Sequence, residues 1–123
     1  MLAKTIPGLL LTLAFAAPAA AANYPISGAY GESKATGKDR VDCRKVRVID
    51  FRGNQRTDTG GGVPAYRNVS VTRQGDKAFK VVDEFSNGQI TGGKVAYTLR
   101  QMPEDRIELA LDRGGTIKLQ RCK

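Results

Sequence analysis

The stretch RIELALDRGGTIKLQ, residues 106–120, decides the fold class, because apolar and polar residues alternate on both sides of a central Asp-Arg-Gly-Gly. The apolar side chains of each half share one face: Ile107, Leu109 and Leu111, then Ile117 and Leu119. Such alternation is typical of a half-buried β-strand, and a short connection that contains glycine is typical of a β-hairpin. The stretch therefore predicts antiparallel strands at 106–112 and 116–122.

Similar alternating segments, separated by short turn sequences, fill the chain upstream of this hairpin. They predict further strands at 26–31, 43–51, 64–73, 78–85 and 89–100. The last of these can break into two at Gly92-Gly93, and Asn87-Gly88 before it suits a type I′ turn. Other turns are expected at 74–76 and 102–105. Seven or eight short strands predict an all-β fold: an antiparallel up-and-down meander that closes into a small barrel.

Three segments depart from this simple pattern. Residues 43–51 change the parity of their apolar positions, so we expect a β-bulge near Val48-Ile49 that turns all four apolar side chains inward. Residues 33–40 are polar and charged, and residues 53–64 are rich in glycine. We interpret the last two as loops that flank one end of the barrel, where binding residues commonly lie.

The first 22 residues have the composition of a secretory signal peptide. Lys4 precedes an apolar run over residues 9–17, and Ala20-Ala21-Ala22 ends the segment with small residues. A transmembrane anchor is the alternative, but the apolar run is too short to cross about 30 Å of hydrocarbon. We therefore predict a leader at 1–22, a single β-barrel domain at 23–123, and a periplasmic or secreted location.

Export determines how the two cysteines are interpreted. Two thiols in an oxidising compartment usually pair, and the chain has no C-x-x-C spacing that would indicate redox chemistry. We expect a disulfide between Cys43 and Cys122, which would connect the second strand to the last. Because such a connection joins the two ends of the meander, it favours a closed barrel over an open sheet.

Composition argues against an enzyme. The 123 residues include no His, so the commonest general base and metal ligand is absent. Three carboxylate pairs are interpreted as solvated surface groups: Asp39/Asp42, Asp83/Glu84 and Glu104/Asp105. Residues 83–88 resemble a calcium loop only in part, because Phe85 stands where an oxygen ligand is needed. We expect no catalytic residue, no metal site and no cofactor.

The chain is basic, with 20 Lys and Arg against 12 Asp and Glu and a formal charge of +8. Removing the leader and its one lysine lowers this charge only to +7, so the bias belongs to the barrel domain. One candidate anion patch consists of Arg44, Lys45, Arg47 and Arg52. A second scatter consists of Arg67, Arg73, Lys77 and Lys80. The alternative is that these side chains only keep the surface soluble and protect strand edges.

Two short motifs resemble the lipocalin-like (calycin) barrels. Gly28-Ala29-Tyr30 opens the first strand, where that family has Gly-x-Trp, and Arg121 lies in the last strand. The resemblance implies that Gly28, Tyr30 and Arg121 close the base of the barrel, with Arg121 packed across the first strand. It also implies that the protein binds a small apolar ligand.

A second resemblance is to the bacterial periplasmic inhibitors of secreted metalloproteases, which are exported, eight-stranded and of similar size. Those proteins insert an amino-terminal tail into the protease, and here residues 23–27 could form such a tail. They pair cysteines that are closer in sequence, and they carry Trp in the first strand, where this chain has Tyr30.

These observations leave three hypotheses for the function. The first is a non-enzymatic, exported small β-barrel that binds an apolar or anionic ligand or an envelope component. The second is a periplasmic protease inhibitor, with a protease as its partner. The third is a structural envelope protein with no small ligand. In none of them is nucleic acid a partner, because export separates the two, and after cleavage the chain does not span a membrane.

Overall fold

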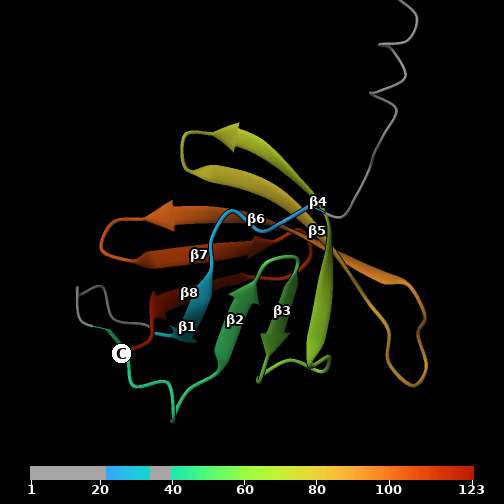
Figure 1. The fold of residues 1–123 in the computed structure, drawn as a ribbon, viewed down its shortest axis with the longest axis horizontal. Coiled ribbons are helices and arrows are strands. Elements are labelled where there is room, and N and C mark those ends of the chain that lie inside the picture. Colours follow the sequence, from blue (N-terminus) through green and yellow to red (C-terminus); the bar gives the residue numbers. More distant parts are fainter. Residues whose placement is uncertain (1–21, 34–39) are drawn as a thin grey trace, which may run out of the picture.

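Eight antiparallel strands form a closed barrel in the computed structural model, which describes residues 22–33 and 40–123 (Figure 1). In chain order they are β1 (Gly28–Glu32), β2 (Val48–Arg52), β3 (Gln55–Asp58), β4 (Ala65–Gly75), β5 (Ala78–Phe85), β6 (Gly93–Met102), β7 (Arg106–Leu111) and β8 (Thr116–Arg121). Each strand pairs with its neighbours in the chain, and β1 also pairs with β8. The predicted all-β meander and its closure are therefore confirmed.

The apolar core lies between two layers of the barrel. In Figure 1, β1, β2 and β3 run steeply across β6, β7 and β8. Inward-facing residues of these strands and of β5 fill the space between the layers: Tyr30, Ile49, Phe51, Phe79, Val81, Tyr97, Leu99, Ile107, Leu109 and Leu119, together with Tyr24 from the segment that precedes β1. This alternation is what a single core requires of strands that have one solvated face.

The 106–120 hairpin forms as its sequence predicts. The residues that pair across it run from Arg106 with Gln120 to Ala110 with Thr116. The Leu111 amide donates a hydrogen bond to the Gly115 carbonyl over 3.0 Å. Gly114 has a φ of 123°, which a side chain would strain, so a glycine is needed at this turn.

The predicted strand at 43–51 is wrong in its first half. Strand β2 begins at Val48, and residues 43–47 form an irregular segment. The expected bulge is also absent, because Ile49 and Phe51 are fully buried on regular pairing whereas Val46 and Val48 are half-buried. Pairing with β1 stops near Glu32, whose amide bonds the Arg47 carbonyl, so no partner strand remains for residues 43–47.

Strand β3 was not predicted, since it lies within residues 53–64, which we expected to be a loop. Its inward-facing residues are Arg56 and Asp58, so hydrophobic alternation does not mark it. The register shifts occur in β4 instead, at Asn68/Ser70 and at Arg73/Gly75.

The connection between β5 and β6 is longer than expected. The β6 strand begins at Gly93, so residues 86–92 form a loop that extends beyond the barrel, in orange at the right of Figure 1. The type I′ turn is wrong, because Gly88 does not have a positive φ. The Asn87 side-chain oxygen instead accepts hydrogen bonds from the amides of Gln89 and Ile90, over 2.8 and 2.7 Å, and this favours a wider turn.

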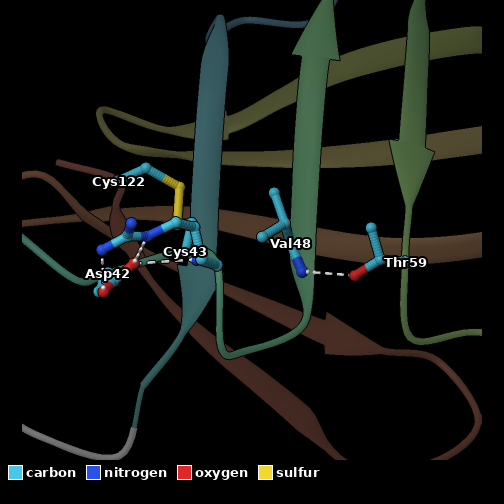
Figure 2. The surroundings of a disulfide bond; sticks show 6 residues. Asp42, Cys43, Val48, Thr59 and Cys122 are labelled. Carbon is cyan, nitrogen blue, oxygen red and sulfur yellow. Dashed lines mark hydrogen bonds and ion pairs between the residues drawn. A yellow bond between two sulfur atoms is a disulfide. The ribbon is translucent and has the colours of Figure 1, made fainter.

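The predicted disulfide between Cys43 and Cys122 is confirmed, with 5.6 Å between their Cα atoms (Figure 2). Cys43 belongs to the irregular segment before β2, and Cys122 directly follows β8. Val41 forms an isolated parallel bridge with Cys122, so this segment lies along the end of β8. Of the sequence predictions, the leader up to residue 21 and residues 34–39 of the polar loop lie outside the described residues.

Candidate ligand-binding groove

An open groove of about 440 Å³ runs over one end of the barrel, beside β3, β4 and β5 and the 86–92 connection. Its lining combines two aromatic rings with mainly polar side chains: Gln55, Arg56, Thr57, Ala65, Tyr66, Arg67, Glu84, Phe85, Ser86, Thr91 and Gly92. The Gly92 amide donates a hydrogen bond to the Ser86 hydroxyl oxygen. This bond joins the two ends of the 86–92 connection at the edge of the groove.

Two aromatic rings form the apolar part of the groove. The rings of Tyr66 and Phe85 meet edge to face with 5.6 Å between their centres, and both residues are half-buried. The Arg56 guanidinium lies 3.8 Å from the centre of the Tyr66 ring, close enough for a cation–π interaction. Because the Arg56 guanidinium is also bonded to the buried Asp83 carboxylate, its contact with Tyr66 fixes the orientation of that ring.

Below the groove, a buried ionic network replaces part of the apolar core. Asp83 is fully buried and accepts three hydrogen bonds, from Arg56 Nε at 2.6 Å, Tyr97 Oη at 2.8 Å and Asn68 Nδ2 at 3.1 Å. A buried carboxylate is tolerated when it is paired and its oxygens are satisfied, and both conditions hold here. Our interpretation of Asp83 as a solvated surface group is therefore wrong.

Asp58 continues the network toward the surface. Arg47 donates two hydrogen bonds to its carboxylate, from Nε at 2.9 Å and from Nη2 at 2.7 Å, and the Gly60 amide donates a third at 2.9 Å. Burial alone would raise the pKa of Asp58. The Arg47 and Gly60 hydrogen bonds, with the charges of Arg47 and Arg56, outweigh burial and hold this pKa below its ordinary value.

Two tyrosines complete the interior of this end. Burial raises the pKa of the Tyr97 hydroxyl well above its ordinary value, and the Asp83 charge adds to this effect while the Arg56 charge opposes it. The pKa of Tyr24 is also raised, first by burial and then by the Asp83 charge. Among the described residues, no hydrogen bond partner reaches the buried Tyr24 hydroxyl or the Asn68 side-chain oxygen.

The three residues singled out as barrel-closing lie together at the opposite end. The side chain of Arg121 donates from Nη2 to the Tyr30 hydroxyl over 2.7 Å, and its guanidinium carbon is 4.6 Å from the Tyr30 ring centre. Gly28 has a φ of 109°, and a Cβ there would come within 2.5 Å of the Arg121 guanidinium. Strands β1 and β8 therefore meet through a close contact at Gly28, where the positive φ favours glycine.

The candidate anion patch lies on the irregular segment at 43–47 and on β2, and most of its positive charge is paired. Each of its three arginines binds a carboxylate: Arg44 binds Asp42, Arg47 binds Asp58 and Arg52 binds Asp50. Lys45 is exposed. Arg47 is only 25% exposed, because it reaches over the barrel end to Asp58 rather than pointing outward.

The buried network was not predicted, although the sequence contains part of the signal for it. Asp83 has the same parity as Phe79 and Val81, which places it on the inward face of its strand. Arg56 and Asp58 gave no such signal, since no apolar neighbour marks the inward face of β3.

Within the described residues, no group of His, Cys, Asp and Glu is arranged to hold a metal ion. The same part of the chain contains no helix long and apolar enough to cross a membrane. Comparisons with known proteins found no match to the chain among family models, curated proteins or solved structures.

Proposed function

We propose that this protein is a non-enzymatic, exported, lipocalin-like small barrel that binds a small, mainly apolar ligand in the groove beside Tyr66 and Phe85. The observation that carries the proposal is the groove itself. Its volume of about 440 Å³ lies within the range of small-molecule sites, and it combines aromatic rings with a few polar groups.

The charges around the groove favour an apolar ligand over a highly charged one. Both cations in its lining are already paired: Arg56 with Asp83, and Arg67 with Glu84. The polar groups that remain are neutral, such as the hydroxyls of Thr57 and Thr91. A ligand with a planar apolar part and one or two hydrogen-bonding groups therefore fits the groove chemistry best.

Two further features support an exported binding protein. The Cys43–Cys122 disulfide is typical of an oxidising compartment, as a periplasmic or secreted location would provide. Both thiols are joined in the disulfide, so neither is free to act as a nucleophile. A hydroxyl nucleophile would lack its usual base, because the chain has no His.

The protease-inhibitor alternative requires the segment at 23–27 to leave the barrel. In the structure this segment lies on the barrel, with Tyr24 buried against Phe51 at a ring-centre distance of 5.1 Å. The Tyr24 amide also donates to the Gly53 carbonyl over 2.9 Å. Release would expose an aromatic ring to water, so the ordered segment favours the ligand-binding proposal.

The proposal can be tested with the neutral fluorescent probe N-phenyl-1-naphthylamine, because the chain has no Trp whose emission would interfere. We expect saturable binding by the folded protein, and an affinity that is lower by about tenfold or more in Tyr66→Ala and in Phe85→Ala. Val69→Ala is the matched control, since Val69 is an exposed apolar residue that is not part of the groove lining.

Circular dichroism of each variant checks that the barrel persists. Equal probe affinity in all variants would refute the groove as the site, and no binding to any folded form would favour the structural hypothesis without a small ligand. Native mass spectrometry of protein exported by its own host would then identify a ligand that co-purifies with it.

A further inference from the structure

A second, cationic depression lies at the end of the barrel opposite the groove. Turns of an up-and-down barrel alternate between its two ends, so the β4–β5 and β6–β7 turns share one end and the 86–92 connection lies at the other (Figure 1). The depression has a volume of about 200 Å³. The buried side chains of Tyr30 and Ile107 contribute to it, and Lys77, Arg106 and Arg121 line it as cations.

The cations of this depression are arranged differently from the other arginines near the barrel ends. Arg44, Arg47, Arg52, Arg56 and Arg67 each have a carboxylate within 3.0 Å. In the depression, the one carboxylate is that of Asp105, which lies 3.8 Å from Arg121 Nε and 3.5 Å from Arg40 Nη2. Arg121 therefore shares this carboxylate with Arg40, and no ion pair among the described residues includes Lys77 or Arg106.

Neutral oxygens accept hydrogen bonds from both arginines, and only Arg121 also has an ion pair, with Asp105. Arg121 donates to the Tyr30 hydroxyl at 2.7 Å and to the Ser27 carbonyl at 3.3 Å, and Arg106 Nε donates to the Pro103 carbonyl at 3.2 Å. A guanidinium has five N–H donors, so both side chains retain donors for a ligand. None of the ion pairs among the described residues includes the Lys77 ammonium group.

The turn beside the depression has an unusual backbone. Glu104 and Asp105 have φ values of 66° and 59°, in the left-handed region that side chains disfavour. Two hydrogen bonds from β8 hold this turn: Gln120 Nε2 donates to the Glu104 carbonyl at 2.9 Å, and the Arg121 amide donates to the Asp105 carbonyl at 3.0 Å. Two consecutive positive φ values are typical of a tight hairpin turn, and these hydrogen bonds fix Asp105 beside the depression.

We propose that Lys77, Arg106 and Arg121 form a binding site for a phosphate group, either free or carried by a lipid headgroup. The guanidinium fork matches the oxygens of a phosphate, and the lysine adds a point charge. The site is independent of the aromatic groove, and it shares no residue with the candidate patch of Arg44, Lys45, Arg47 and Arg52, whose arginines are already paired.

The test compares two pairs of substitutions that remove the same charges. Lys77→Gln with Arg106→Gln removes one lysine and one arginine from the depression, and Lys94→Gln with Arg113→Gln removes the same types elsewhere. Arg121 is left unchanged because it also joins β1 to β8. The dispersion of amide resonances in nuclear magnetic resonance spectra checks that both variants fold.

Inorganic phosphate is the first probe. We expect saturable shifts of amide resonances around Arg106, an affinity lower by about tenfold in the depression variant, and a change within about twofold in the control variant. Vesicles of phosphatidylglycerol, with phosphatidylcholine vesicles for comparison, are the second probe. Binding of vesicles only would identify a lipid headgroup as the source, and binding of inorganic phosphate only would identify a soluble one.

Three results would overturn the proposal. The first is that neither probe binds, and the second is that shifts grow linearly without saturation. The third is an equal loss of binding in the two variants, because this would mean that only the overall positive charge matters. None of these results bears on probe binding in the aromatic groove, so the two proposals can fail separately.

Discussion

Replacing Asp83 by Leu should lower the free energy of unfolding by about 3–5 kcal/mol, because it leaves a charged guanidinium buried without a close partner. Arg56 is only 5% exposed, and its Nε atom lies 2.6 Å from the Asp83 carboxylate. The next carboxylate is that of Asp58, 3.9 Å from Arg56 Nη1 and already bonded to Arg47. Asp58 is therefore a weaker substitute for the lost partner of Arg56.

Replacing Arg56, the other member of this ion pair, should destabilise the protein by a similar amount. Arg56→Met leaves the Asp83 carboxylate buried with hydrogen bonds from Tyr97 and Asn68 but without a cation, and we again expect a loss of about 3–5 kcal/mol. Tyr97→Phe removes only one donor to a charged acceptor, so its expected cost is smaller, about 1.5–3 kcal/mol. This substitution therefore gives a graded reference in the same network.

The combination of Arg56→Met with Asp83→Leu gives the decisive measurement. It replaces a buried ion pair by apolar side chains, a change that is often neutral or stabilising, so we expect the double variant to be more stable than either single variant. A domain of this size is stable by about 5–15 kcal/mol, so losses of about 3–5 kcal/mol are a large and measurable share of its stability.

Urea unfolding at pH 7, followed by far-ultraviolet circular dichroism, measures all four free energies. The coupling energy between the two positions should exceed about 2 kcal/mol. Strict additivity, with a double variant that loses the sum of the two single losses, would contradict the argument, because it would mean that Arg56 and Asp83 contribute independently and do not form a pair.

Three further predictions concern other parts of the barrel. Replacing both Cys43 and Cys122 by Ala should lower the free energy of unfolding in urea by about 4 kcal/mol, because their separation of 79 residues closes a long loop. The pKa of Asp58 is lowered by folding, so its contribution is present above an unfolded value of about 3.9 and is lost as the pH falls through the folded value. Arg47→Gln should therefore raise the midpoint of acid unfolding, and an unchanged midpoint would refute this role. Tyr24→Phe removes a buried hydroxyl without a partner, so thermal unfolding should show a gain of about 1 kcal/mol, whereas a loss would mean that the hydroxyl forms a hydrogen bond.

The fold could be predicted where the inward-facing residues are apolar. The β7–β8 hairpin is the clearest case, since Ile107, Leu109 and Leu119 carry the alternation and all three are buried. The same rule failed at β3, where Arg56 and Asp58 take the inward positions. A pattern of hydrophobic residues cannot reveal a strand whose inward side chains are charged.

The buried network also required information that no local pattern contains. The parity of Asp83 indicates an inward carboxylate, but its partner Arg56 lies 27 positions earlier in the chain. Only the pairing of β3 with β4 and of β4 with β5 brings the two together. The direction of Arg47 was unpredictable for a related reason, because it follows an irregular segment that the disulfide holds at the barrel end.

The groove arises from the same departures from a regular meander. An eight-stranded barrel has an interior just wide enough for side chains, and here Phe51 and Tyr97 are among those that fill it. The aromatic site lies instead at the end where the 86–92 connection extends beyond the strands (Figure 1). A two-residue turn at Asn87-Gly88 would have removed Thr91 and Gly92 from that edge. The extra length of this connection, more than the barrel itself, therefore gives this protein a candidate binding site.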